Sequence, residues 1–302
     1  MKANKLLLLV LVAMLPQIVD AQGSRWKRFR YEVVFGLGAS QFLGELGGAD
    51  QIGTDFYKDL EIRMTRPAGT LGMRYKLTPQ SALKFGLTWG AVAGDDALTK
   101  EEHRSNRSIH FRSHIVELAA TYEFYLKKEQ AGHRFRLRGV KGRKAKGFYP
   151  YGFFGISGFW FNPRAKDQNG TWTSLKRLGT EGQYVSDTRR PYSRIGFAIP
   201  LGIGFKYKLD RQFLIGMEYG KRKTFTDYID DTSTTYWAND VIASSEAGAT
   251  GAYLADPTQG QWVGAAPNQQ RGDPTDNDSF MFLTITLNYT LQTTRGGLPK
   301  FR

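Results

Sequence analysis

Apolar and polar residues alternate along most of the chain. Alternation with a period of two is typical of β-strands whose two faces meet different surroundings. The pattern occurs at least eight times, over stretches of about the 9–11 residues with which a tilted strand crosses a membrane. These stretches predict strands at residues 31–45, 67–77, 81–93, 108–126, 148–161, 192–209, 212–226 and 278–292.

Each expected strand except the fifth has one apolar and one polar face. A soluble β-sandwich gives the same alternation, because it turns apolar faces inward and leaves charges in water. In a small membrane barrel the polar face points inward instead, and eight strands enclose a space just wide enough for side chains to fill. The barrel interpretation therefore predicts no open pore, and ion pairs between inward carboxylates (Glu32, Glu117, Glu123, Glu218) and inward cations (Arg74, Lys76, Lys84, Lys206).

The connections between strands alternate in length. Residues 78–80 and 210–212 are short turns, and residues 127–147 belong to the same set, whereas the other connections are mostly much longer: 46–66, 94–107, 162–191 and 227–277. Short periplasmic turns, long extracellular loops and aromatic girdles are typical of outer-membrane barrels. The expected girdle consists of Tyr31, Tyr75, Tyr125, Tyr149, Tyr207 and Tyr289. The fold predicted is all-β, an eight-stranded antiparallel transmembrane β-barrel.

One short sequence is repeated at two of these connections. Residues 75–80 read YKLTPQ and residues 207–212 read YKLDRQ, each between apolar alternations. The repeat predicts two equivalent periplasmic hairpins. Pro200 lies inside an expected strand, where a residue without an N–H group predicts a bulge or a bend.

The N-terminal segment indicates export. Residues 1–21 combine two lysines with a short apolar stretch and a small-residue end, which is typical of a secretory signal peptide. Residues 22–302 are then expected to form the barrel domain in the cell outer membrane. The chain has no cysteine, so neither a lipoprotein acyl site nor a disulfide framework is available.

The net charge is +14 at pH 7, a value that often indicates a nucleic-acid partner. We expect none, because an exported chain rarely meets nucleic acid and the excess is concentrated in residues 127–147. That segment has nine lysines or arginines against the single Glu129. It is either a solvated flap, in contact with the headgroups of outer-membrane lipids, or a docking site for a periplasmic protein. The candidate partner-binding residues are Arg134, Phe135, Arg136, Leu137, Arg138, Lys141, Arg143 and Lys144.

Enzymatic candidates are sparse. Some small outer-membrane barrels act on lipid A through a Ser/His pair at the external rim, and His103 and Ser105 fit that position. The chain has four histidines and no unusual carboxylate cluster beside this pair, so a chance His-x-Ser is the simpler interpretation. His110 and His114 could bind a metal only if their faces agree. We expect no catalytic, cofactor-binding or metal-binding residues.

Three other short motifs have simple structural explanations. Asp273, Asp276 and Asp278 could hold calcium weakly, but turn formation accounts for them better. Gly36-Leu37-Gly38 lacks the third glycine and the helix of a nucleotide-binding loop. Residues 271–273 read RGD, and three residues carry almost no information.

Several segments between residues 30 and 292 resemble the PorG-like outer-membrane barrel family of Bacteroidota. They are residues 42–47 (FLGELG), 150–163 (PYGFFGISGFWFNP), 178–183 (LGTEGQ) and 222–231 (RKTFTDYIDD) with 233–236 (STTY). The resemblance implies a non-catalytic component of the type IX secretion system that ties a periplasmic ring, formed by a lipoprotein and its partner, to the outer membrane. Lys176 and Arg177 depart from the family pattern before LGTEGQ. A paralogue with a general structural, adhesion or envelope role is the alternative.

Overall fold

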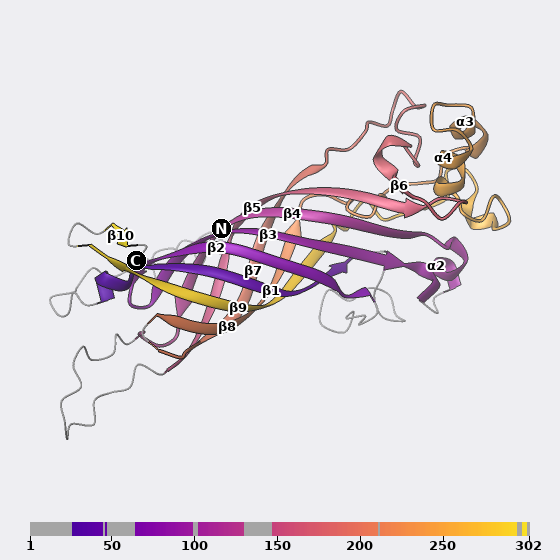
Figure 1. Cartoon of the computed structure of the whole chain (residues 1–302). Helices are drawn as coiled ribbons and strands as arrows, with labels where there is room; N and C mark the ends of the chain where they lie inside the picture. The colour runs from indigo at the N-terminus through magenta and orange to yellow at the C-terminus, as the bar shows by residue number, and fades with distance from the viewer. Residues whose placement is uncertain are drawn as a thin grey trace, which may run out of the picture.

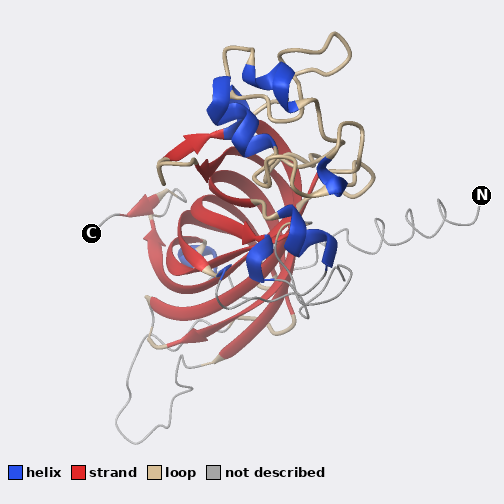
Figure 2. Ribbon diagram, turned by 90° about the vertical axis from the view of Figure 1, so that its right-hand side faces the viewer, coloured by secondary structure: helices blue, strands red, loops and turns tan. Residues whose placement is uncertain are grey.

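The computed structural model describes residues 26–44, 46, 64–98, 102–129, 147–210, 212–294 and 298–300. Eight long strands of this part of the chain pair with their neighbours in antiparallel fashion, and pairing of the first with the last closes a barrel (Figures 1 and 2). The predicted fold class is confirmed. The strands are β1 (Tyr31–Leu43), β2 (Arg66–Thr78), β3 (Ser81–Asp95), β4 (His110–Tyr125), β5 (Phe148–Lys166), β7 (Ile195–Lys208), β8 (Phe213–Thr224) and β9 (Ser279–Thr293).

Shorter elements lie at the two ends of the barrel. At one end, which we call the turn end, are the connections β2–β3, β4–β5 and β7–β8, with η1 (Trp26–Phe29) and β10 (Pro299–Lys300). At the other, the loop end, are η4 (Asp96–Leu98), α2 (Glu102–Arg107), β6 (Trp172–Ser174), η5 (Leu175–Arg177), α3 (Asn239–Ala243), α4 (Gly248–Ala255) and η6 (Val263–Ala265) (Figure 1). Of the helices described, none is long and apolar enough to cross a membrane.

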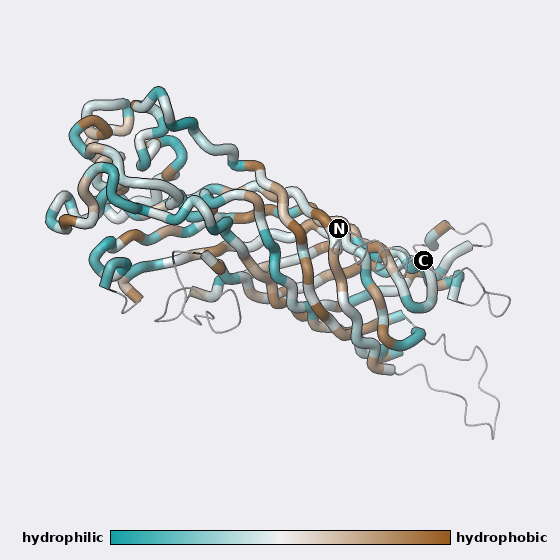
Figure 3. Tube along the Cα trace, turned by 180° about the vertical axis from the view of Figure 1, so that it is seen from behind, coloured by the Kyte–Doolittle hydropathy of each residue, from teal (hydrophilic) through white to brown (hydrophobic). Residues whose placement is uncertain are grey.

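The outer surface of the barrel is apolar. Leu118, Ile156 and Ile203 are 67%, 72% and 68% exposed, and exposed apolar residues on the neighbouring strands continue the belt. Figure 3 shows hydrophobic and hydrophilic residues alternating along the barrel strands. Leaving such surface in water costs about 25 cal/mol per Å², whereas hydrocarbon accommodates it without that cost. The chain is therefore a small barrel of the outer-membrane type. In such barrels short turns face the periplasm and long loops face outward, which orients the turn end and the loop end.

Strand pairing explains why two strands run further than the sequence predicts. β3 and β4 pair up to Asp95 and His110, and β5 continues to Lys166 by pairing with β6. These ladders extend beyond the apolar belt, so the loss of strict apolar alternation there hid them from the sequence analysis. Inside this loop end lies an apolar core that includes Phe111, Phe161 and Phe280.

The expected tyrosine girdle is only partly correct. Tyr31, Tyr75, Tyr207 and Tyr289 share the parity of the apolar outer face, and the rings of Tyr31 and Tyr75 lie 5.1 Å apart. Two of the expected members point the other way and are buried in the barrel: Tyr125 and Tyr149. Their parity in β4 and β5 places them among the inward side chains, where Tyr125 donates a hydrogen bond to Glu123.

A bulge or a bend was predicted at Pro200, and the bulge is absent. The register of β7 is constant on both sides, with Pro200 opposite Arg222 of β8. The ladder with β5 is instead interrupted at Gly155 and Ile156, which this register sets opposite Pro200 and Ile199. The missing N–H is therefore accommodated by skipped rungs rather than by an extra residue.

Candidate functional site

The centre of the barrel is filled by a charge network around Arg74. This side chain is 0% exposed. Its guanidinium reaches Glu123 at 2.6 Å, Glu32 at 2.8 Å and Glu218 at 3.1 Å, and it also donates to the Asn288 Oδ1 atom at 2.9 Å. Because each of these groups comes from a different strand, the network ties opposite walls of the barrel together. Buried charges are tolerated only when they are paired and hydrogen-bonded in this way.

The ion pairs predicted for the interior are largely confirmed. Lys76 and Lys206 bind Glu32 at 2.6 and 3.0 Å, and Lys84 binds Glu218. Glu117 differs, because its partner is Arg222 of β8 at 3.2 Å. In the sequence, Arg222 stands out only as part of a family motif, and it was not among the predicted inward cations.

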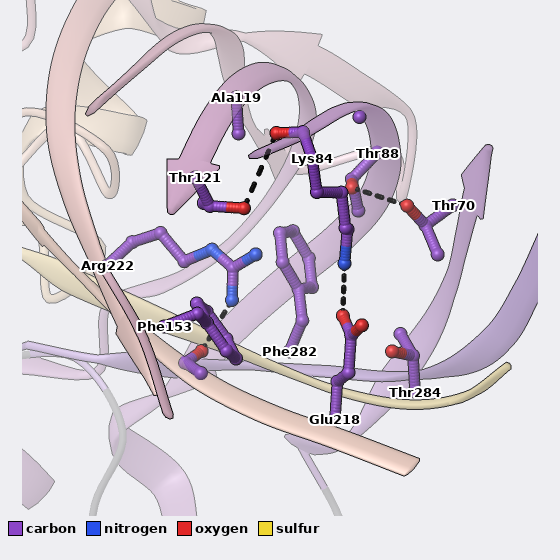
Figure 4. A pocket seen from close by; sticks show the side chains of 12 residues that line it. Thr70, Lys84, Thr88, Ala119, Thr121, Phe153, Glu218, Arg222, Phe282 and Thr284 are labelled. Atoms are coloured by element: carbon purple, nitrogen blue, oxygen red, sulfur yellow. Dashed lines mark hydrogen bonds and ion pairs between the residues drawn. The ribbon is translucent and has the colours of Figure 1, made fainter. Parts of the chain in front are cut away.

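A small polar cavity lies between these pairs (Figure 4). Its volume is about 30 Å³, which has room for one or two water molecules. In Figure 4 Lys84 points to Glu218, Thr70 faces Thr88 and the Arg222 guanidinium lies beside them. A space of this size suits solvating waters and is far below the 300–1,000 Å³ or so of a small-molecule site.

The turn end of the interior is closed by Glu129, the only acid of the basic segment. Its carboxylate binds Lys76 at 2.6 Å and Lys208 at 2.9 Å. These two lysines occupy equivalent positions in the repeated YKL-x-x-Q sequence. The glutamines of the repeat also act alike, since the Gln80 and Gln212 backbone carbonyls accept the backbone N–H groups of Tyr125 in β4 and Thr290 in β9, both at 2.7 Å. The repeat thus forms two hairpins, β2–β3 and β7–β8, whose lysines both bind the Glu129 carboxylate.

Electrostatics favour the charged form of Glu129. Burial opposes ionisation, but the attraction of Lys76, followed by that of Lys206, lowers the pKa of this carboxyl to about 2. The backbone N–H of Lys208 donates to the Gly147 carbonyl at 3.0 Å. The two described flanks of the basic segment, residues 127–129 and 147, are therefore fixed to the same mouth of the barrel. The candidate residues between them, Arg134 to Lys144, lie outside the described residues, as does the expected signal peptide at 1–21.

At the loop end, a second buried network joins three long connections. The Glu181 carboxylate accepts from the Ser233 and Thr234 N–H groups at 2.9 and 3.1 Å and from the Thr234 hydroxyl at 2.7 Å. It also binds the Arg271 guanidinium at 3.0 Å. The Arg271 carbonyl in turn accepts from Arg107 at 2.6 Å. We call the connections joined here, within residues 96–109, 167–194 and 225–278, the cap.

The cap explains the motifs that carry the family resemblance. LGTEGQ supplies Thr180 and Glu181, and the segment ending in STTY supplies Asp231, Ser233 and Thr234. The RGD sequence is not an exposed tripeptide, because Arg271 is 1% exposed and bound to Glu181. Sequence reasoning missed Glu181, Asp231 and Arg271 as a group, although the motif boundaries marked two of the three.

Asp231 is a fully buried acid in this cap. Its carboxylate accepts from the Thr180 and Tyr192 hydroxyls at 2.5 and 2.6 Å. Burial raises the pKa of Asp231 to about 6, although the Arg271 guanidinium and these two hydrogen bonds act in the opposite direction. The folded cap therefore binds a proton more tightly than the unfolded segment does.

Protonation of Asp231 should consequently make the cap more stable in mild acid than at neutral pH. Stability contributed by protonated Asp231 is fully present below its ordinary pKa of 3.8 and is lost as the pH rises through about 6. Hydrogen exchange of cap amides, corrected for the intrinsic rate at each pH, should show less opening at pH 4.5 than at pH 7. D231N should remove this difference. An unchanged pH profile in D231N would assign the effect to another group.

The catalytic and metal candidates are not brought together. His103 and Ser105 lie two residues apart on α2, a spacing that puts side chains on different faces of a helix, and the His103 ring packs against Trp262 at 4.8 Å. His110 and His114 share the outer face of β4 but are four residues, or about 13 Å, apart along the strand. The His110 Nε2 atom accepts the Lys166 N–H at 3.0 Å.

Two of the three aspartates that suggested a weak calcium site bind backbone N–H groups instead. Asp273 accepts the Thr275 N–H and hydroxyl at 3.0 and 2.7 Å. Asp278 accepts the Ile229 N–H at 2.8 Å. Across the described residues no group of three or more His, Asp or Glu side chains is arranged to hold a metal ion.

Solved structures similar to this chain are outer-membrane barrels. Ail, the attachment invasion locus protein of Yersinia pestis, is 10% identical over 86% of this chain and 99% of its own, with a TM-score of 0.36. Neisserial surface protein A is 7% identical over 86% and 95%, also at 0.36. AlkL, solved in DMPC bilayers, is 10% identical over 93% and 98%, again at 0.36.

No curated protein matches the chain. A family model does match, over residues 5–249, which is well over half of the sequence. The chain therefore belongs to the family described as a domain of unknown function, DUF6089.

Proposed function

We propose that this barrel is a non-catalytic anchor of the type IX secretion system, which ties the periplasmic ring of a lipoprotein and its partner to the cell outer membrane. The observation that carries the proposal is the attachment of both flanks of the basic segment to the turn-end mouth, through Glu129 and Gly147. A docking segment whose two ends are held in place binds more tightly, because less conformational entropy is lost on binding.

Two further features support a structural role. The Arg74 network fills the interior, so the described barrel has no continuous passage for cargo. The family resemblance, which rests on segments that build the cap and strands β1, β5 and β8, supplies the link to type IX secretion in Bacteroidota. The basic segment would add a field of like charges that attracts an acidic partner.

Neutralising the basic segment should weaken ring attachment without affecting the barrel. Each exposed charge pair contributes only about 0–1 kcal/mol, so the change must be collective: Arg134, Arg136, Arg138, Lys141, Arg143 and Lys144 to glutamine. We expect co-purification of the ring lipoprotein to fall several-fold, to become more salt-sensitive, and secretion of cargo to decline. Pull-down of the full-length chain from cells, with heat-modifiable gel migration as the folding check, measures this.

A charge-preserving variant is the matched control. Exchanging arginine for lysine and lysine for arginine at the same six positions should leave attachment near the parental level. A photo-cross-linker at Phe135 or Leu137 then identifies what the segment touches. Capture of a ring component supports the anchor. Capture of lipid alone, with secretion unchanged after neutralisation, would contradict it and favour a general envelope role.

A further inference from the structure

Two arginines face each other on the outer surface of the barrel. Arg112 of β4 and Arg164 of β5 are directly opposite in the ladder. Both share the parity of exposed Val116 and Trp160, so they lie on the outward face. Side chains opposite each other in an antiparallel pair have Cβ atoms about 4.5–5.5 Å apart, and like charges in this position destabilise the sheet. The arrangement therefore calls for an anion.

The described part of the chain does not supply that anion. Neither guanidinium makes an ion pair there, and the buried Arg112 Nε atom has no hydrogen-bond partner. The nearest carboxylate on the neighbouring strand is Asp95, which is opposite His110 rather than Arg112 and accepts the Ala97 N–H at 3.0 Å. Lys166, two residues beyond Arg164 on the same face, lies over Trp172 at 5.7 Å and adds a third cation.

The height of the pair on the barrel is informative. Trp89, Val116 and Trp160 form one exposed rung, and tryptophans mark the boundary between hydrocarbon and headgroups. The arginines lie four residues further toward the loop end, which is about 13 Å along a strand and about 10 Å along the membrane normal after a tilt of about 40°. This places the arginines at the outer edge of the headgroup layer, which adds about 5–8 Å to each side of the hydrocarbon core.

Between the tryptophan rung and the arginine pair lies His114, whose ring could contact a lipid headgroup. His114 stacks on Trp89, with ring centroids 5.9 Å apart and planes inclined by 21°. The imidazole presents a flat ring between the tryptophan belt and the arginine pair. Flat rings of this kind suit the apolar face of a sugar.

We propose that Arg112 and Arg164 bind the phosphate of a phosphorylated glycolipid of the lipid A type in the outer leaflet. Two guanidinium forks match a phosphate group bidentately, the acyl chains would lie along the apolar belt below, and Lys166 would contact a second anionic group above. The site is on the opposite end of the barrel from the proposed ring anchor, so either proposal can fail without the other.

The test is binding of purified lipid to the full chain in detergent, followed by native mass spectrometry. Monophosphorylated lipid A should bind, and the same lipid without its phosphate should bind about tenfold more weakly, since a hydrogen bond to a charged group contributes about that much. R112Q/R164Q should lower binding of the phosphorylated lipid by at least about tenfold. R177Q/R190Q, which removes two exposed cap cations, should bind like the parent.

A second variant keeps the test independent of folding defects. R164E would place a carboxylate opposite Arg112, so it should abolish lipid binding while raising the lipid-free unfolding temperature, because repulsion becomes attraction. Equal binding of the two lipids, or full binding by R112Q/R164Q, would overturn the proposal. Displacement of the lipid by an equal concentration of inorganic phosphate would also overturn it, since the site would then recognise a free anion.

Discussion

R74M should prevent the barrel from reaching its stable form. Arg74 is the shared partner of Glu32, Glu123 and Glu218, and methionine fills similar space without a charge. Removing one member of a buried ion-pair network costs about 3–5 kcal/mol, because the remaining charges are left buried and unpaired. Typical domains have only about 5–15 kcal/mol of stability. We expect loss of heat-modifiable migration, or a large fall in the urea midpoint of unfolding in detergent.

Two matched variants separate charge from packing. Among the described residues Lys84 has one ion-pair partner, Glu218, and its side chain is 13% exposed, so K84M should be clearly milder than R74M. R74M/E123Q removes one of the stranded carboxylates and should recover part of the lost stability, with a coupling energy of about 0.5–3 kcal/mol. If R74M unfolds at the parental urea concentration, the network does not hold the walls together and the interior must be more hydrated than its contacts indicate.

The barrel could be predicted from sequence because its two faces obey one rule. Inward Glu32 and Arg74 alternate with outward Val33 and Met73, and this parity fixes both the strands and their register. The same rule identified most interior cations. It did not identify Arg222 as the partner of Glu117, since the residues are 105 apart in sequence and only closure of the barrel brings them together.

Parity also fails where a strand is apolar on both faces. β5 carries Tyr149, Tyr151 and Phe153 inward and Phe154 and Ile156 outward, so its alternation gives no information about which tyrosines meet the membrane. This is why Tyr149 was assigned to the girdle, and its inward position is clear from its packing with Tyr125, Tyr151 and Phe153. Tyr125 was assigned to the girdle for a different reason, its place at a strand end. It shares the parity of the inward Glu117 and Glu123 in β4, and it donates a hydrogen bond to Glu123.

Glu129 shows a different limit of sequence reasoning. Counted by composition, it is the one acid in a basic segment and reduces the charge of that segment slightly. In the structure Glu129 fixes the start of the basic segment to the barrel, because Lys76 and Lys208 bind its carboxylate from two hairpins. The repeated YKL-x-x-Q sequence was visible, but its common target was not, since nothing in the repeat itself indicates that its lysines bind a residue of the connection between β4 and β5.

The cap could not be predicted, because its order depends on single long-range contacts rather than on a period. Arg271 and Glu181 are 90 residues apart, and each lies in a connection without a regular hydrophobic pattern. Arg107 extends the chain of contacts by binding Asp96 at 2.8 Å and the Arg271 carbonyl at 2.6 Å. The Arg271–Glu181 ion pair thus fixes two connections whose local sequence does not favour any regular secondary structure.

E181Q should open the cap while leaving the barrel intact. The carboxylate serves four donors, and an amide presents an NH₂ group to at least one of them. Leaving Arg271 buried without its counter-ion should cost about 3 kcal/mol, which raises the population of open cap about a hundredfold. Limited proteolysis should then cut within residues 225–278 far faster than in the parent, with heat-modifiable migration unchanged.

E246Q provides the control for this last prediction. Glu246 is an exposed carboxylate between α3 and α4, so its change alters the charge of the cap by the same amount without touching the Arg271 network. We expect parental proteolysis for E246Q. Because the barrel wall is held by a separate set of ion pairs around Arg74, cap opening in E181Q should not lower the urea midpoint of the barrel. A cap that resists protease in E181Q would mean that its apolar contacts with the loop-end core, such as Leu254 and Ile229, suffice to keep it closed.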